Sequence, residues 1–216
     1  MDKTSRILVT GANGHVGFNL IKMLLEDGYQ TLCASVRDAA DPAKTTALKA
    51  LGLTDLVSLD VRDAEQFKKV CAGVDVLFHV AATYRLHTGG ADADAEMIKD
   101  STDGVRSAMM AAAQNAVSKV VLTSSVVTLP MVSDDSVWPN EDCWNEQATV
   151  PYIKAKTDAE KLAWSLAEEL GVNLVTVLPG AVLGPNFGRG TQSTDFILAV
   201  MKGSMRMGTT TPRMPV

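Results

Sequence analysis

Short apolar runs alternate with amphipathic stretches along most of the chain. The runs are rich in Val, Ile and Leu, as is typical of parallel strands that are covered by helices on both faces. We expect strands over 6–10, 30–36, 56–59, 74–80, 119–124 and 173–178. Between them, apolar residues recur three or four positions apart, which predicts helices. These helices should follow residue 14 and cover 45–51, 64–71, 95–115, 151–170 and 194–201.

This alternation predicts an α/β fold, a doubly wound Rossmann-type parallel sheet with helices on both faces. In the long helix expected over 95–115, an apolar stripe should face the sheet, formed by Val105, Ala108, Met109 and Ala112. We expect one domain over 1–180. From Gly184 the composition shifts toward Gly, Pro, Thr and Met, so 181–216 should be only the start of a C-terminal substrate lobe.

Composition narrows the class of partner. The chain has 216 residues, of which 46% are apolar and 21% charged, with a net charge of −5 and no basic stripe. These values are ordinary for a soluble α/β protein and argue against a nucleic-acid partner. No apolar run approaches the length of a membrane helix, and the three cysteines are far apart. We therefore expect a cytoplasmic protein with reduced thiols and no bound metal.

The first strand runs directly into a glycine-rich turn, Gly11-Ala-Asn-Gly14-His-Val-Gly17, and a helical pattern follows it. In this context one glycine supplies a positive φ, one lets the backbone approach a pyrophosphate, and one packs the helix closely on the strand. The N–H groups at the start of the helix can then hold phosphate. A strand, such a turn and a helix together predict a dinucleotide site.

Tyr152 and Lys156 are four residues apart in an expected helix and therefore share one face. A cation beside a phenol favours the phenolate and brings the group into range for acid–base catalysis. Taken alone, this spacing is more often a half-exposed tyrosine and a solvated lysine. Ser124 and Ser125 end the fifth strand, where a hydroxyl can stabilise a substrate oxyanion or, as the simpler role for Ser124, cap the strand end.

Together these features resemble an extended short-chain dehydrogenase/reductase of the NAD(P)-dependent epimerase/dehydratase superfamily, in its dihydroflavonol-4-reductase-like branch. The resemblance covers essentially the whole chain. The segments that carry it are Leu8-Val-Thr-Gly-Ala-Asn-Gly-His-Val-Gly17, Val36-Arg-Asp38, Phe78-His-Val-Ala-Ala82, Val121-Leu-Thr-Ser-Ser125, Asn140-Glu-Asp-Cys-Trp144 and Leu178-Pro-Gly180.

The resemblance implies a catalytic triad of Ser125, Tyr152 and Lys156. Tyr152 would pass a proton to the substrate oxygen, while Lys156 would hold the cofactor ribose and lower the pKa of the phenol. The remaining implied cofactor residues follow the strand ends in chain order. They are Gly11, Asn13, Gly14, His15, Val16 and Gly17 at the turn, Asp60 and Val61 at the adenine, Val80, Ala81 and Ala82 along the cofactor, and Pro179 near the nicotinamide.

The end of the second strand bears on the choice between NADP and NAD. An NAD site favours an acid there, which accepts a hydrogen bond from the ribose 2′-hydroxyl. This chain has Arg37, which can clamp a 2′-phosphate but cannot accept a hydrogen bond. The resemblance makes Lys44 a second basic position. Asp38 is an acid one place later that could still reach the ribose, so we favour NADP over NAD without excluding NAD.

We therefore expect an NADP-dependent reductase that turns a small-molecule carbonyl into an alcohol, acting as a monomer or homodimer. The alternatives are a nucleotide-sugar epimerase/dehydratase and a catalytically silent dinucleotide-binding protein. Pro130 stands where plant dihydroflavonol reductases carry an asparagine used on the flavonoid, so the resemblance does not name the substrate. Plausible pocket residues are Tyr84, Arg85, Val126, Val127 and Met131. His79 should be a core histidine, and His87 has no assigned role.

Overall fold

The fold is described by a computed structural model that covers residues 2–82, 90–130, 132, 138–184 and 190–204. Within these residues, one parallel sheet has the strand order β3-β2-β1-β4-β5-β6. The strands are β1 (Ile7–Thr10), β2 (Leu32–Val36), β3 (Asp55–Ser58), β4 (Val76–His79), β5 (Lys119–Thr123) and β6 (Leu174–Val177). The predicted doubly wound fold is confirmed, and β1 lies at the point where the strand order reverses.

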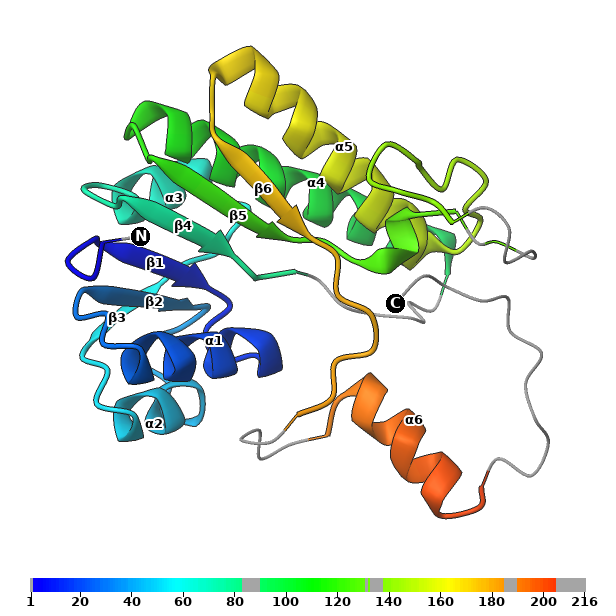
Figure 1. Ribbon diagram of the computed structural model, residues 1–216, viewed down its shortest axis with the longest axis horizontal. Helices are drawn as coiled ribbons and strands as arrows, with labels where there is room; N and C mark the ends of the chain where they lie inside the picture. The colour runs from blue at the N-terminus through cyan, green and yellow to red at the C-terminus, as the bar shows by residue number, and fades with distance from the viewer. Residues whose placement is uncertain (1, 83–89, 131, 133–137, 185–189, 205–216) are drawn as a thin grey trace.

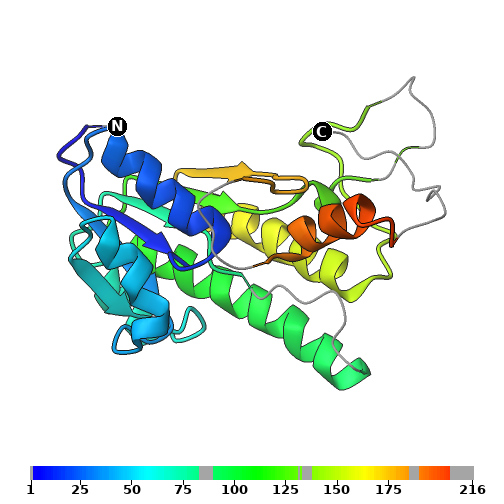
Figure 2. The same ribbon diagram turned by 90° about the horizontal axis from the view of Figure 1, so that it is seen from below.

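Helices cover both faces of the sheet (Figure 1). The described helices are α1 (His15–Glu26), α2 (Pro42–Ala50), α3 (Ala64–Val70), α4 (Ala91–Gln114), α5 (Pro151–Leu170) and α6 (Gln192–Met201), with a 3-10 turn, η1 (Val126–Thr128). α1 and α2 pack on one face, while α3, α4 and α5 pack on the other. α6 lies beyond the C-terminal ends of the strands, on the side of α1 (Figure 2).

Alternate residues of each strand supply the two cores. Ile7 and Val9 of β1 pack toward α1 and α2, whereas Leu8 between them packs toward α3, α4 and α5. All three side chains are fully buried, and burial of such a side chain stabilises a fold by about 1.5–3 kcal/mol. The predicted stripe of α4 is also confirmed, because Val105, Ala108, Met109 and Ala112 are all buried.

The ends of several elements differ from the predicted ends by a few residues. α2 begins at Pro42 rather than at residue 45, because the Asp41 side chain accepts a hydrogen bond from the Ala43 N–H and caps the helix. α5 covers Pro151–Leu170 as predicted, and Gly171, which has a φ of 68°, caps its end. The turn η1 was not predicted. It matters for the site because it fixes the chain directly after β5.

The last described segment leaves the sheet after β6, which lies at the edge of the sheet. Val175 and Val177 of this strand are 40% and 49% exposed. α6 then begins at a capping box in which the Thr191 and Thr194 side chains each bond the other residue's backbone. The division at residue 180 and the substrate lobe stay predictions.

Candidate active site

One cleft of about 1020 Å³ runs along the carboxyl ends of the strands. Parallel strands bring their carboxyl ends to one edge, and ligands of doubly wound sheets bind there. Every residue predicted to bind cofactor or to take part in catalysis lines this cleft. Those residues are Gly11, Asn13, Gly14, His15, Val16, Gly17, Arg37, Lys44, Asp60, Val61, Val80, Ala81, Ala82, Ser125, Tyr152, Lys156 and Pro179.

The glycine turn brings three segments of backbone unusually close together. Gly11 has a φ of 65°, and a Cβ added to it would lie 2.8 Å from the Cα of Ala81. A Cβ on Gly17 would lie 2.5 Å from the Gly11 carbonyl oxygen. Gly14 caps α1 without a side-chain hydrogen bond, and the first turn holds no acidic residue. The positive end of the α1 dipole therefore faces the cleft without a competing carboxylate.

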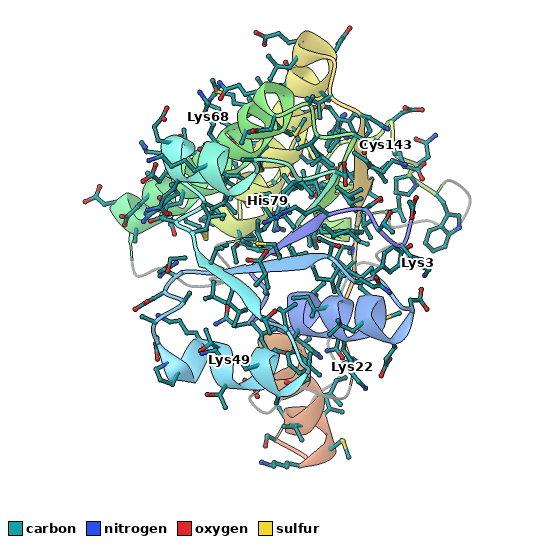
Figure 3. All side chains as sticks on the ribbon, turned by 90° about the vertical axis from the view of Figure 1, so that its left-hand side faces the viewer. Lys3, Lys22, Lys49, Lys68, His79 and Cys143 are labelled. Atoms are coloured by element: carbon teal, nitrogen blue, oxygen red, sulfur yellow. The ribbon has the colours of Figure 1, made fainter. Side chains whose placement is uncertain are left out.

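Hydrogen bonds of Thr10, one of them to His79, hold the residues that follow β4 next to the glycine turn. The Thr10 Oγ1 accepts hydrogen bonds from the N–H groups of Val80 and Ala81, both at 3.1 Å. Its own proton is then left to donate to His79 Nδ1, at 3.0 Å. Burial lowers the pKa of His79 to about 4, and the neighbouring charge of Lys156 adds to this effect. His79 is thus a neutral, interior histidine, as predicted (Figure 3).

The end of β2 presents positive charge to the cleft. Arg37 is exposed and lines the cleft together with Lys44 of α2, which pairs with Asp41 at 3.3 Å. Asp38, the acid that complicated the sequence argument, is not among the described residues that line the cleft. Its carboxylate accepts a hydrogen bond from the Ala40 N–H at 2.9 Å. The cleft therefore meets two cations at this point, and the nearby acid is engaged with its own backbone.

Arg62, in the loop after β3, forms two ion pairs, one of them with α4, and we call this group the Arg62 clasp. Arg62 bonds Asp60 at 2.7 Å and Asp100 of α4 at 3.0 Å. The hydrogen bond from Arg62 holds the pKa of Asp60 at about 2, against a smaller opposing effect of burial. All three side chains line the cleft. The Arg62 clasp fixes the wall formed by Asp60 and Val61, which the resemblance assigns to the adenine.

Ser125, Tyr152 and Lys156 come together where η1 meets the first turns of α5. Tyr152 is buried and Lys156 is half-buried, and the Lys156 Nζ donates to the Thr123 carbonyl oxygen at 3.4 Å. The Ser125 Oγ accepts a hydrogen bond from the Val127 N–H. Burial lowers the pKa of Lys156 from 10.5 to about 8, while the charge of Glu160 opposes this change. The site therefore holds an ammonium whose charge changes close to neutral pH.

Comparisons with known proteins show which family the chain belongs to. The sequence profile of the NAD dependent epimerase/dehydratase family matches residues 7–211. The chain belongs to this family. Cinnamoyl-CoA reductase 1 of Arabidopsis thaliana is 34% identical over 191 residues, covering 83% of this chain and 53% of the relative. Dihydroflavonol 4-reductase of Zea mays is 36% identical over 192 residues, with the same coverage of each chain.

A solved structure supports the fold of this family member. Vestitone reductase from alfalfa (Medicago sativa) matches with a TM-score of 0.75 at 23% identity, over 91% of this chain and 63% of the reductase. The chain spans about half the length of the curated relatives it matches. The predicted similarity to the dihydroflavonol-reductase-like branch is confirmed by these relatives. The roles of individual residues stay predictions.

Sequence reasoning missed several residues at the site. Thr191 and Ser193, at the start of α6, line the cleft, although no residue after Pro179 had been assigned to it. The Thr191-x-x-Thr194 capping pattern was a signal for a helix start at residue 192 instead of the predicted 194, but it carries no information about the cleft. The Ser124 hydroxyl, for which capping of the strand end was the simpler expectation, donates to the buried carboxylate of Glu160. Glu160 was not singled out at all.

The predicted pocket residues divide into two groups. Val126 and Val127 line the cleft, whereas Tyr84, Arg85 and Met131 lie outside the described residues, as does His87. Across the described ranges, no cluster of His, Cys, Asp or Glu could hold a metal ion. Within the same ranges, no helix is both long and apolar enough to cross a membrane.

Proposed function

We propose that this chain is the cofactor half of an NADP-dependent oxidoreductase that reduces an aldehyde or ketone to an alcohol. The supporting observation is one cleft that is lined by the glycine turn at one end and by Ser125, Tyr152 and Lys156 at the other. An extended dinucleotide needs such a cleft, with phosphate groups at the helix start and the reacting ring near an acid–base pair. The relatives named above are reductases, which favours the same reaction class.

The cleft fits a nicotinamide dinucleotide. The absence of a Cβ at Gly11 and Gly17 leaves the turn close to β4 and opens the N-terminus of α1 to a pyrophosphate. Arg37 and Lys44 would bind the 2′-phosphate of NADP, because a guanidinium and an ammonium can both pair with phosphate oxygens. The Asp38 carboxylate is engaged by Ala40, which weakens the case for NAD.

Each residue of the trio has a distinct chemical task. The Tyr152 hydroxyl would donate its proton to the carbonyl oxygen, and the Ser125 hydroxyl would donate a hydrogen bond to that same oxygen. The Lys156 ammonium would stabilise the phenolate that Tyr152 leaves behind and would hold the ribose hydroxyls. When bound, the reduced nicotinamide supplies the hydride. The trio is therefore competent only while Lys156 carries its proton, which its pKa of about 8 makes sensitive to pH.

Binding of NADPH and NADH to the purified chain tests the cofactor. Fluorescence titration should show that NADPH binds more tightly. R37D should abolish this preference, since an acid in place of the cation repels the 2′-phosphate. R106D is the matched control, because Arg106 is an exposed arginine of α4 that does not line the cleft. Equal loss of NADPH and NADH affinity in R37D would contradict the assignment of NADP.

Turnover on a panel of aldehydes and ketones tests the reaction. Y152F should remove NADPH oxidation and leave NADPH bound, since only the phenol proton is lost. Y29F is the control, because the partly buried Tyr29 packs against the core and does not line the cleft. Tight NADPH binding without turnover by the unaltered chain would favour a silent dinucleotide-binding protein. Interconversion of nucleotide sugars with bound NAD would favour an epimerase instead.

A further inference from the structure

A second, smaller cavity adjoins the cleft, and Lys156 lines both. Its volume is about 40 Å³, and its walls come from α4, α5 and the ends of β4 and β5. Its polar walls are His79, Asp100, Ser101, Thr123, Ser124, Lys156 and Glu160. A water needs about 10–15 Å³ and two or more polar partners, so the cavity has both the room and the chemistry to hold water.

Glu160 is the unusual member of this cavity. It is 3% exposed and lies one helical turn after Lys156 on the same face of α5. Its carboxylate accepts a hydrogen bond from the Ser124 hydroxyl at the end of β5. A buried carboxylate is unfavourable unless it is hydrogen-bonded and balanced by a nearby positive charge. Within the described residues, Glu160 makes no ion pair of 4.0 Å or less.

Apart from Lys156, the titratable groups that face the cavity do not balance this charge. From β4, His79 is neutral, since burial lowers its pKa to about 4. From α4, Asp100 is itself an acid, and it is already paired with Arg62. From α5, Lys156 is the cation that lines the cavity with Glu160. The charges around the cavity therefore reduce to one ammonium and one carboxylate.

We propose that Glu160 is a positioning residue, whose Ser124-bonded carboxylate acts across this cavity as the counter-charge that keeps Lys156 protonated. The inference rests on the proposed function for its catalytic meaning, because a neutral Lys156 cannot stabilise the Tyr152 phenolate. Its physical content is independent of turnover. Glu160 sets the charge state of Lys156, and Ser124 sets the position of Glu160.

Competitive labelling of lysines with acetic anhydride tests the proposal, because the neutral amine alone reacts. The pKa of Lys156 is read from its acetylation between about pH 6 and pH 10, with mass spectrometry of the peptide that contains it. In E160Q, which keeps the acceptor for Ser124 but loses the charge, that pKa should fall by about one to two pH units from its value of about 8. E160D should keep most of the original value, and E168Q, an exposed site on the same helix, should leave it unchanged.

An unchanged pKa of Lys156 in folded E160Q would overturn the proposal, since a role in packing alone would leave that pKa as it is. If E160Q does not fold, K156M/E160Q decides the matter. The double variant leaves neither charge buried alone and should fold, whereas its failure to fold would assign Glu160 a structural role only. Failure of the unaltered chain to bind NADPH would overturn the proposed function and leave the labelling result to decide this inference separately.

Discussion

Replacement of His79 by asparagine should remove part of the acid sensitivity of the fold. His79 is fully buried, and its pKa lies at about 4 instead of the ordinary 6.5. Between these values the unfolded chain binds a proton that the folded chain does not, so stability falls as the pH drops from about 6.5 to about 4. At about 1.4 kcal/mol per pH unit, this difference amounts to about 3 kcal/mol. Above pH 6.5 the contribution does not change with pH.

The assay is urea unfolding of the native chain and of H79N at a series of pH values, followed by circular dichroism. Asparagine places an amide oxygen near the position of Nδ1, so it can still accept the Thr10 hydroxyl. The free energy of unfolding of the native chain, relative to H79N, should fall by about 3 kcal/mol between pH 7 and pH 4. Parallel stability curves for the two proteins would refute the reasoning, because they would mean that His79 titrates alike in both states.

Three further outcomes follow from particular contacts. G17A should destabilise the fold by about 1–3 kcal/mol and weaken NADPH binding, because its Cβ would lie 2.5 Å from the Gly11 carbonyl oxygen; normal NADPH affinity in G17A would contradict this. NADPH affinity should fall about tenfold as the pH rises from 7 to 9, because Lys156, with a pKa of about 8, loses its charge. Fluorescence titration of K156M should show no such fall. An equal fall in K156M would refute the role of the Lys156 charge in NADPH binding. F67A should lose about 3–5 kcal/mol in urea unfolding, because the Phe67 ring is fully buried and packs 5.6 Å from the His79 ring; a loss under about 1 kcal/mol would contradict this.

Much of the site could be predicted from local sequence patterns. The glycine turn, the ends of the strands and the Tyr152–Lys156 spacing are each short-range signals, and their residues all line one cleft. This is because parallel strands joined by right-handed crossovers present their carboxyl ends at one edge, whatever the intervening sequence. The start of α2 was placed too late, since a cap and a proline outside the apolar pattern set it.

The amino-acid sequence by itself determined the order of the elements, the apolar stripe of α4, and many of the residues that line the cleft. Only the tertiary structure decided that Ser124 meets Glu160, 36 positions later, and that Arg62 reaches Asp100, 38 positions later. The hydrophobic periodicity of the sequence does not predict such pairs, because they depend on which helix packs beside which strand end. The physical reason is the distance along the chain over which each kind of interaction acts. Backbone preferences and hydrophobic periods act over a few residues, whereas these polar pairs form only through the packing of helices against the whole sheet.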